Sequence, residues 1–418
     1  MSLSPTNAPA RKTSPYKVLA NRDYRLLWFG QLVSQIGTQM RLAAIGWQIY
    51  VLTHDPLQLG LIGICRIVPL IFFSFIGGPA ADAKDRRRLL LVTETILLFF
   101  SAVLALVTVT GVVTVWWIYG ITIMTSIANA FERPAYSALI PSLVPRTQLG
   151  NAMSLNTVNF QISIILGSGL GGTIIAIFGL QGAYIIDAVS YLAVTLALLL
   201  IKHRPIVKSG NRVSVKAAFE GIHFVWKQKI LVSIMLLDFF ATFFGTSRLL
   251  LPVITTEVLH SNEVGFGLLS ASEFIGGLLC SLVMGWVNVQ NLKKPGIVLL
   301  VAVFIYSLSI ILFGFSNWFP LSMLFLALSG AADTVSMVLR QTIAQLVTPD
   351  ELRGRMQSIN MIFFMGGPQL GEMEAGIVAK AAGAPFSVVS GGIACMLVVL
   401  SISYYARQLR DYRFEKNH

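Results

Sequence analysis

Charged residues are scarce in this sequence: they make up 12% of its 418 residues, whereas hydrophobic residues make up 55%. Soluble domains carry about 25% charged residues. A chain with so few charges exposes too much apolar surface to remain dissolved, so the composition excludes a soluble globular enzyme and a disordered tail. It favours one polytopic membrane unit over several soluble domains.

Cysteine and the common catalytic motifs are also lacking. The three Cys residues lie within apolar runs, at spacings that match no metal motif, and we expect them to be small buried hydrophobes. The sequence contains no HExxH, no GxSxG and no Gly-Lys dipeptide, and its five His residues lie outside the centres of the apolar runs. These absences argue against a membrane enzyme and against ATP binding through a Walker A loop, so we expect no enzyme activity, metal or cofactor.

Long apolar runs are what the sequence has in abundance. A membrane span needs about 20 mostly apolar residues, and such runs must be helical because lipid cannot satisfy backbone N–H and C=O groups. We count twelve, at residues 26–52, 58–81, 89–110, 116–137, 151–178, 183–201, 230–254, 264–287, 297–315, 319–341, 357–379 and 384–405. Residues 1–23 are polar and have no apolar core, so we expect no signal peptide there.

Basic residues exceed acidic ones, with 31 Lys and Arg against 19 Asp and Glu and a net charge of +12. A nucleic-acid-binding protein would show a basic face or stripe. Instead, 24 of the 31 basic residues lie in the two ends of the chain and in alternate connections, while the remaining connections contain only Lys380. Because connections rich in Lys and Arg stay in the cytosol, we expect both termini to be cytosolic, and no nucleic-acid partner.

The longest polar connection, residues 202–229, divides the chain near its midpoint. It suggests a cytosolic tail (1–23), a six-helix half (24–201), a linker with an amphipathic helix (202–229), a second six-helix half (230–405) and a cytosolic tail (406–418). A weak internal repeat supports the duplication: IPSLVPRTQLGNAM at 140–153 aligns with IAQLVTPDELRGRM at 343–356. Repeats of this kind place a binding site between the halves, near the middle of the membrane.

Three segments carry a resemblance to a known family. Residues 77–88 (GGPAADAKDRRR) resemble the signature loop of the major facilitator superfamily: Gly78, then Asp82, then Arg86 and Arg87. Residues 131–145 (FERPAYSALIPSLVP) and the following LGNA resemble its enterobactin-exporter-like and macrolide-efflux-like branch. Residues 167–172 (GSGLGG) resemble a glycine-rich exporter motif, with Ser168 where a Pro usually stands, so close helix packing alone is an alternative.

The resemblance implies an all-α membrane protein of twelve transmembrane helices in two pseudo-symmetric six-helix halves. It also implies a monomer in a bacterial inner membrane that exports a small amphipathic molecule, a siderophore or a drug, in exchange for protons by alternating access. The signature loop would act as a conformational latch, and a plain positive-inside anchor is the alternative. A lipid-handling or lysolipid-handling facilitator of the same fold is the closest rival, and a non-transporting sensor is a third possibility.

Ionisable side chains inside the predicted spans are candidates for the transport site, because each costs about 2.5–3.5 kcal/mol at a span centre. The candidates for proton coupling are Glu372, Asp238, Glu273 and Asp333. By the resemblance, spans one, four, seven and ten line the cavity, and the cavity candidates are Arg41, Gln48, Asn129, Glu132, Arg133 and Glu374.

Arg41, Glu273 and Glu372 share a level near mid-membrane, and the working hypothesis pairs Arg41 with Glu372 or Asp238. A switch between paired and unpaired states would load and unload a proton. The alternative is that each charge serves as an interhelical bond that holds the bundle together. That structural role is preferred for the charges near the ends of the spans, which are Glu94, Arg133, Asp187 and Arg340.

Overall fold

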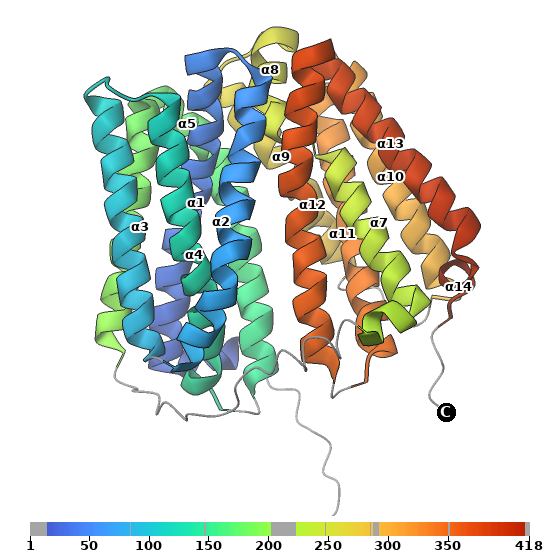
Figure 1. The fold of residues 1–418 in the computed structure, drawn as a ribbon, viewed down its shortest axis with the longest axis horizontal. Coiled ribbons are helices and arrows are strands. Elements are labelled where there is room, and N and C mark those ends of the chain that lie inside the picture. The colour runs from blue at the N-terminus through green and yellow to red at the C-terminus, as the bar shows by residue number, and fades with distance from the viewer. Residues whose placement is uncertain are drawn as a thin grey trace, which may run out of the picture.

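The computed structural model describes residues 15–83, 85–145, 148–201, 223–246, 248–284, 286, 292–349 and 352–413. Side chains are described for all of these except 15–17, 75, 78, 79, 81–83, 353–355, 357, 358, 361, 362 and 365. Within these residues all regular secondary structure is helical, and the long helices run side by side in two bundles (Figure 1).

The helices of the first bundle are η1 (Pro15–Ala20), α1 (Arg22–Thr53), α2 (Pro56–Ala83), α3 (Arg86–Val109), α4 (Val115–Leu143) and α5 (Leu149–Leu200). Polar side chains define two of their starts: Asn21 caps α1 by accepting from the Asp23 N–H, and Asp85 caps α3 by accepting from the Arg87 N–H. Buried hydrogen bonds then join α1 to α5, where the Trp28 indole N–H donates to the Leu155 carbonyl at 2.9 Å.

The helices of the second bundle are α7 (Lys229–Gly245), η3 (Arg248–Leu250), α8 (Leu251–Val253), η4 (Ile254–Val258), α9 (Glu263–Met284), α10 (Pro295–Phe315), α11 (Phe319–Val347), α12 (Arg353–Ala382), α13 (Ala384–Tyr405) and α14 (Arg407–Arg410). The division between the bundles falls within 202–222, outside the described residues, so the exact boundaries of the two halves and of the linker stay predictions. Of the predicted amphipathic linker helix, only residues 223–227 are described, and they are helical.

Eight of the described helical segments are long and apolar enough to span a membrane. They belong to α2, α3, α5, the α7–η4 segment, α9, α10, α11 and α13. The helices α1, α4 and α12 are as long but more polar. With these three, and with α5 counted as two crossings, the described helices agree with the twelve predicted spans.

The 52-residue element α5 covers two of the predicted spans and consists of two helices that meet at Gly179, which has φ 71° and ψ 177°. Only glycine adopts that conformation without strain. The chain therefore turns back at one residue, where the sequence predicted a short connection at 179–182.

The helix α7 is discontinuous within the predicted seventh span. It ends at Gly245, and η3, α8 and η4 continue the path. The Tyr306 hydroxyl on α10 donates to the Gly245 carbonyl at 2.9 Å, so the freed backbone group at the break is satisfied by protein. Arg248 is the first residue of η3, beyond this break.

Two ends of the molecule are used below as reference points. The upper end carries the turn between α1 and α2 at His54, and the lower end carries the connection between α2 and α3 at Asp85 (Figure 1). The largest buried apolar cluster contains residues of both bundles, including Trp47 and Phe266. A second cluster is confined to the lower part of the first bundle, around Tyr24 and Leu139.

Candidate functional site

Polar contacts join the two bundles at the upper end. The Tyr50 hydroxyl on α1 donates to a Glu257 carboxylate oxygen of η4 at 2.8 Å. Next to the α1–α2 turn, the Lys380 ammonium of α12 donates to Asp55 at 2.7 Å. Below these contacts the rings of Trp47 and Phe266 lie 5.2 Å apart.

Glycines bring the backbones of the two bundles together along two seams. At the α2–α12 seam, a β-carbon placed on Gly63 would collide with the Gln369 carbonyl oxygen and lie 3.0 Å from Glu372 Oε2. At the α5–α9 seam, a β-carbon on Gly172 would lie 2.6 Å from the Gly267 Cα. The glycine-rich segment at 167–172 therefore packs closely against α9 and α1, which is the packing role that the sequence left open.

All of these contacts between bundles lie in the upper part of the molecule. In α2 they involve its first turns, and in α12 they involve residues after Gln369. Among the described residues, the bundles are thus closed against each other at the upper end.

An ion pair crosses the α2–α12 seam just below the closest glycine contacts. Arg66 Nη1 of α2 lies 3.7 Å from Glu372 Oε1 of α12. The other carboxylate oxygen of Glu372 is buried without a hydrogen-bond partner. A neutral carboxyl group would hold this arginine far less strongly than a carboxylate does.

A second ion pair lies beside the first, within the second bundle. The Arg248 guanidinium of η3 donates to both Glu273 carboxylate oxygens, from Nε at 2.7 Å and from Nη2 at 2.9 Å. The same guanidinium lies 4.5 Å from the centre of the Phe274 ring. Its charge also acts on Glu372. We call Arg66, Glu372, Arg248 and Glu273 the central cluster.

Charged side chains that remain exposed below the seams indicate an accessible space between the bundles. The Arg248 side chain is 52% exposed. Asp333 of α11 is 41% exposed, and Arg133 of α4 is exposed. Since the upper end is closed, this space communicates with the lower end.

Two predicted carboxylates, Asp238 and Asp333, are brought together by Arg340. Arg340 of α11 pairs with Asp238 of α7 and lies 3.5 Å from Asp333 Oδ1. Asp238 and Arg340 are buried, whereas Asp333 borders the accessible space. The sequence assigned Arg340 only an anchoring role near a helix end.

Arg41 is paired with neither Glu372 nor Asp238, so the predicted partnership is not the arrangement seen. Its Nε lies 2.7 Å from Asp187 Oδ2, and the Ser101 hydroxyl donates to the same oxygen at 2.6 Å. All three belong to the first bundle and are buried. The sequence could not orient α1, because its apolar residues occur on most faces.

Gln48, the next cavity candidate on α1, is also enclosed by the first bundle. Its amide accepts from the Tyr184 hydroxyl at 2.7 Å and donates to Thr108 at 3.3 Å. Only 2% of it is exposed. In this conformation Gln48 stabilises the bundle rather than bordering the accessible space.

Adjacent residues of α4 occupy different environments. Glu132 is buried and accepts from the Gln31 amide at 3.3 Å, whereas Arg133 borders the accessible space. Glu94 of α3 is buried close enough to Glu132 for the two carboxylates to repel each other. Asn129, one turn before Arg133, is half-buried.

On α12, Glu374 is half-buried and points about 200° away from Glu372 at 100° per residue.

The predicted latch loop is only partly described. The side chains of Gly78 and Asp82 lie outside the described residues. Arg86 donates to the Ala138 carbonyl at 2.9 Å, and Arg87 donates to the Leu199 carbonyl at 3.0 Å. Both arginines thus bind carbonyl oxygens near the lower ends of α4 and α5, where a positive charge is favourable. The latch itself stays a prediction.

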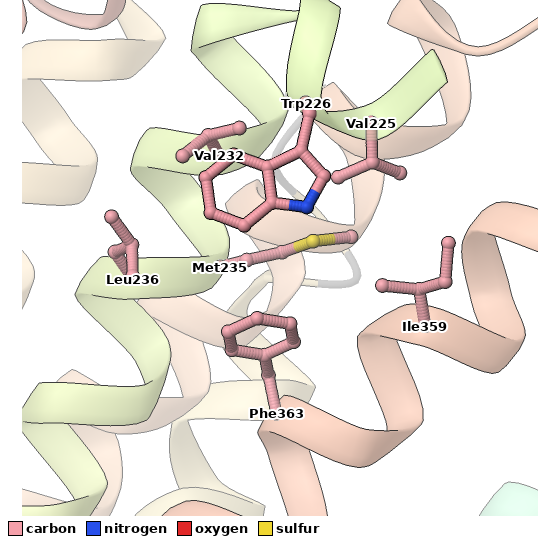
Figure 2. Close-up of a pocket in the computed structure, with 7 residues that line it drawn as sticks. All are labelled: Val225, Trp226, Val232, Met235, Leu236, Ile359 and Phe363. Atoms are coloured by element: carbon pink, nitrogen blue, oxygen red, sulfur yellow. The ribbon is translucent and has the colours of Figure 1, made fainter. Parts of the chain in front are cut away.

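A separate apolar cavity of about 220 Å³ lies near the lower end, between residues 223–227, α7 and α12. Figure 2 shows its walls, which include Trp226, Met235 and Phe363. Its lining residues have no ionisable group, so this cavity offers nothing to orient a charged molecule. The charges of the central cluster make that cluster the stronger candidate site.

A family model described as "Transmembrane secretion effector" matches residues 13–416. The chain belongs to this family of the major facilitator superfamily. The transporter resembles several curated relatives over nearly its whole length. It is 27% identical over 415 residues to the staphyloferrin A transporter of Staphylococcus aureus, covering 94% of this chain and 97% of the relative.

Two more relatives show the range of this similarity. The transporter is 24% identical to the multidrug efflux pump Tap of Mycolicibacterium fortuitum, covering 92% of this chain and 96% of the relative. It is 23% identical to the enterobactin exporter EntS of Shigella boydii, covering 91% of this chain and 92% of the relative. The predicted branch of the superfamily is therefore confirmed.

Solved structures share the fold. A bacterial homologue of the human lysosomal transporter Spinster, in an inward-facing unoccupied conformation, superposes with a TM-score of 0.71 at 14% identity, covering 95% of this chain and 98% of that one. A POT family transporter bound to 5-aminolevulinic acid superposes with a TM-score of 0.75 at 11% identity, covering 93% of this chain and 97% of that one. The protein is thus a multi-pass membrane transporter of a small molecule and not an enzyme.

Sequence reasoning missed the partners that cross the seams. Arg66 received no role from the sequence. Its signal is the spacing Gly60, Gly63, Arg66, because residues three apart lie near one face of a helix. Lys380 was seen only as a basic residue at a helix end.

Proposed function

We propose that this transporter exports a small amphipathic molecule, a siderophore or a drug, by alternating access, and that Glu372 couples export to inward proton movement. The observation that carries the proposal is the Arg66–Glu372 pair across the α2–α12 seam, beside the accessible space. A proton on Glu372 changes a contact that must break when the upper end opens. Coupling thus acts where the two bundles separate.

The conformation supports alternating access with the upper end closed. Opening that end requires separation at Arg66–Glu372, at Asp55–Lys380 and along both glycine seams. None of these contacts lies within a bundle, so the bundles can move as units while their internal hydrogen bonds persist. Motion of one half against the other around a central site is the expected behaviour of repeat-built transporters.

The membrane orientation follows from the basic residues. They concentrate in the connections of the lower end and in both termini. We therefore place the lower end and both termini in the cytosol of a bacterial cell, with the protein in the inner membrane. We also propose that it works as a monomer of two six-helix halves joined by the linker at 202–229.

The substrate and the direction of transport rest on the relatives. One relative is named as a staphyloferrin A transporter, a second as an enterobactin exporter and a third as a multidrug efflux pump. Transport is common to the three names, and two of them state the outward direction, which supports export of a siderophore or a drug. The remaining candidates for proton coupling, Asp238, Glu273 and Asp333, are secondary to Glu372, since they pair within one bundle.

The test uses purified transporter in liposomes with a trapped pH dye and an imposed pH gradient. The panel contains a catecholate siderophore, a macrolide, a cationic dye and a lysolipid. We expect proton flux that depends on one of the first three compounds and disappears in Glu372→Gln. Glu374→Gln is the matched control, because it removes a carboxylate from the same helix on another face, and it should retain the flux.

Two outcomes contradict the proposal in different ways. Movement of a substrate without proton flux leaves a facilitator and removes the coupling role of Glu372. Movement of the lysolipid alone supports the lipid-handling rival.

A further inference from the structure

The apolar cavity near the lower end lies directly below a close contact between α7 and α12. At that contact, a β-carbon on Gly367 of α12 would lie 2.9 Å from the Phe239 carbonyl oxygen of α7. Met235 of α7 and Phe363 of α12 stand one helical turn lower, and both line the cavity of about 220 Å³ (Figure 2). The cavity is thus a gap between two helices that touch one turn above it.

The cavity lies on the apolar, exposed side of α12. Its two lining residues from α12 are Ile359 and Phe363. At 100° per residue, they lie within about 40° of the helix face that carries Leu370 and Ile377. Both of these side chains are exposed, and exposed apolar surface on a membrane-spanning helix contacts lipid. Glu372 is about 200° from Leu370 around the helix, so the cavity is separate from the central cluster.

The cavity reaches the molecular surface beside two lysines. Trp226 forms part of its wall and is 67% exposed, as expected for a tryptophan at the interface between membrane and water. Lys227 and Lys229 are exposed in the short connection between this wall and α7. The connection is compact, since the Gln228 N–H donates to the Val225 carbonyl at 3.0 Å. Positive charges therefore stand beside the cavity, whereas its described lining residues carry none.

We propose that this cavity holds an acyl chain of an anionic phospholipid from the cytosolic leaflet, with the phosphate beside Lys227 and Lys229. The inference takes from the proposed function only the orientation of the lower end toward the cytosol. The lipid is a resident ligand of the second bundle, and it is not the transported molecule.

Two forces would select this lipid. An acyl chain gains no hydrophobic free energy by leaving the bilayer for an apolar cavity, because lipid tails are as apolar as the lining. It gains dispersion contacts instead, because the walls of an unfilled cavity lack contact partners on one side. Basic residues near the membrane surface attract anionic lipids, so Lys227 and Lys229 supply the preference for an anionic headgroup.

Occupancy of the cavity would brace the lower part of α12 against α7. The same helix carries Glu372 and the seam with α2 in its upper part. Because a ligand that binds the folded protein raises its stability, we expect added phosphatidylglycerol to raise the melting temperature of the delipidated transporter.

The test measures lipid binding to the full-length, delipidated transporter in detergent by native mass spectrometry. The probes are phosphatidylglycerol and phosphatidylcholine with identical acyl chains. We expect phosphatidylglycerol to bind about tenfold more tightly, since two lysines contribute. Val232→Trp fills the cavity from α7 and should weaken phosphatidylglycerol binding at least tenfold. Val301→Trp adds the same bulk on an exposed face of α10 and should leave binding unchanged.

A second filling variant keeps the test decisive if Val232→Trp does not fold. Ile359→Trp fills the same cavity from α12 and should also weaken binding at least tenfold. Unchanged phosphatidylglycerol binding in a folded filling variant overturns the inference.

Charge variants test the headgroup. Lys227→Gln/Lys229→Gln should remove the preference for phosphatidylglycerol over phosphatidylcholine. Lys293→Gln/Lys294→Gln is the matched control, because it removes two exposed charges from the connection between α9 and α10 at the same end, and it should retain the preference. Equal binding of the two lipids to the parent protein overturns the anionic lipid.

Other occupants would give different results. Displacement of phosphatidylglycerol by the macrolide or the cationic dye would make the cavity a substrate site and overturn the inference. Movement of a fluorescent phosphatidylglycerol across liposomes that Val232→Trp abolishes would make the lipid a cargo, with the same consequence. Phosphatidylglycerol binding that persists in Glu372→Gln supports the inference, whatever the proton-flux assay shows.

Discussion

Substituting Gly63 by alanine should shift this transporter away from the conformation closed at the upper end. A β-carbon at this position would collide with the Gln369 carbonyl oxygen and lie 3.1 Å from the Glu372 Cβ. Both neighbours belong to α12, across the seam, and the first is backbone that cannot rotate away. The clash exists only while the seam is closed.

The size of the shift follows from the cost of overpacking. Adding a methyl group to a well-packed contact costs about 1–3 kcal/mol. Because the open upper end does not incur this cost, the ratio of closed to open molecules should fall by about 5- to 150-fold. Gly120→Ala is the matched control, since a β-carbon on Gly120 of α4 meets nothing within 4 Å.

Distances between spin labels on the two bundles report this ratio. Val112 and Asn317 are exposed at the upper end, one in each bundle, and can be labelled after the three native cysteines are replaced. We expect a longer distance to gain population in Gly63→Ala and not in Gly120→Ala. Identical distance distributions in the two variants would mean that the α2–α12 contact does not control closure.

Three other expectations concern stability and pH. Asp187→Asn leaves Arg41 buried without its counter-charge and should cost about 3–5 kcal/mol, seen as a lower melting temperature in detergent; a melting temperature equal to the parent's contradicts the pairing. Gly179→Ala places a β-carbon at φ 71° and should cost about 1–2 kcal/mol, again read by melting, and no change would mean that the bend relaxes freely. Burial tends to raise the pKa of Asp55, but the hydrogen bonds from Lys380 and from the Leu57 N–H, together with the positive charge of Lys380, lower that pKa below its ordinary value of 3.8. The Asp55–Lys380 pair therefore favours the closed upper end above pH 3.8, and this stabilisation is lost as the pH falls through the lowered pKa of Asp55. The stabilisation is less than about 1 kcal/mol because both side chains are partly exposed. Spin-label distances that respond to acid equally in Asp55→Asn would contradict this expectation.

The helices and their close contacts could be predicted from sequence to a large extent. Apolar runs of sufficient length must be helical in a membrane. The glycines at residues 167–172 also predicted close helix packing. The bend at Gly179 was placed within the predicted connection. What the sequence did not show is how short this connection is, because the single positive φ at Gly179 reverses the chain without any polar loop.

The candidate site was only half predictable. Glu372 stood out as an acid at mid-span flanked by glycines, and it does lie at the seam. Its partner Arg66 lies about 300 residues away in the chain, on a helix of the other bundle, and nothing local specifies how two bundles dock. Arg41 was expected beside Glu372 because the two share a depth, but depth does not fix the rotation of a helix, and Arg41 faces Asp187 instead.

Three long helices, α1, α4 and α12, are not among the eight apolar segments, and they also carry charges inside the molecule. The polar residues of α1, α4 and α12 include Arg41, Glu132, Arg133 and Glu372. A helix that faces water on one side and lipid on another cannot be uniformly apolar. Low hydropathy in a long run therefore does not mean, in this chain, that the run lies outside the membrane.

The ion pairs differ according to whether they must break. Two pairs within a bundle, Arg41–Asp187 and Arg248–Glu273, join at 2.7 Å, and the first of them is fully buried. Of the pairs between bundles, Arg66–Glu372 is 3.7 Å long, and Asp55–Lys380 is short but solvent-exposed. Long or solvent-screened pairs contribute little free energy. The short pairs within a bundle thus help to hold it together, while the weak pairs between the bundles can separate at little cost.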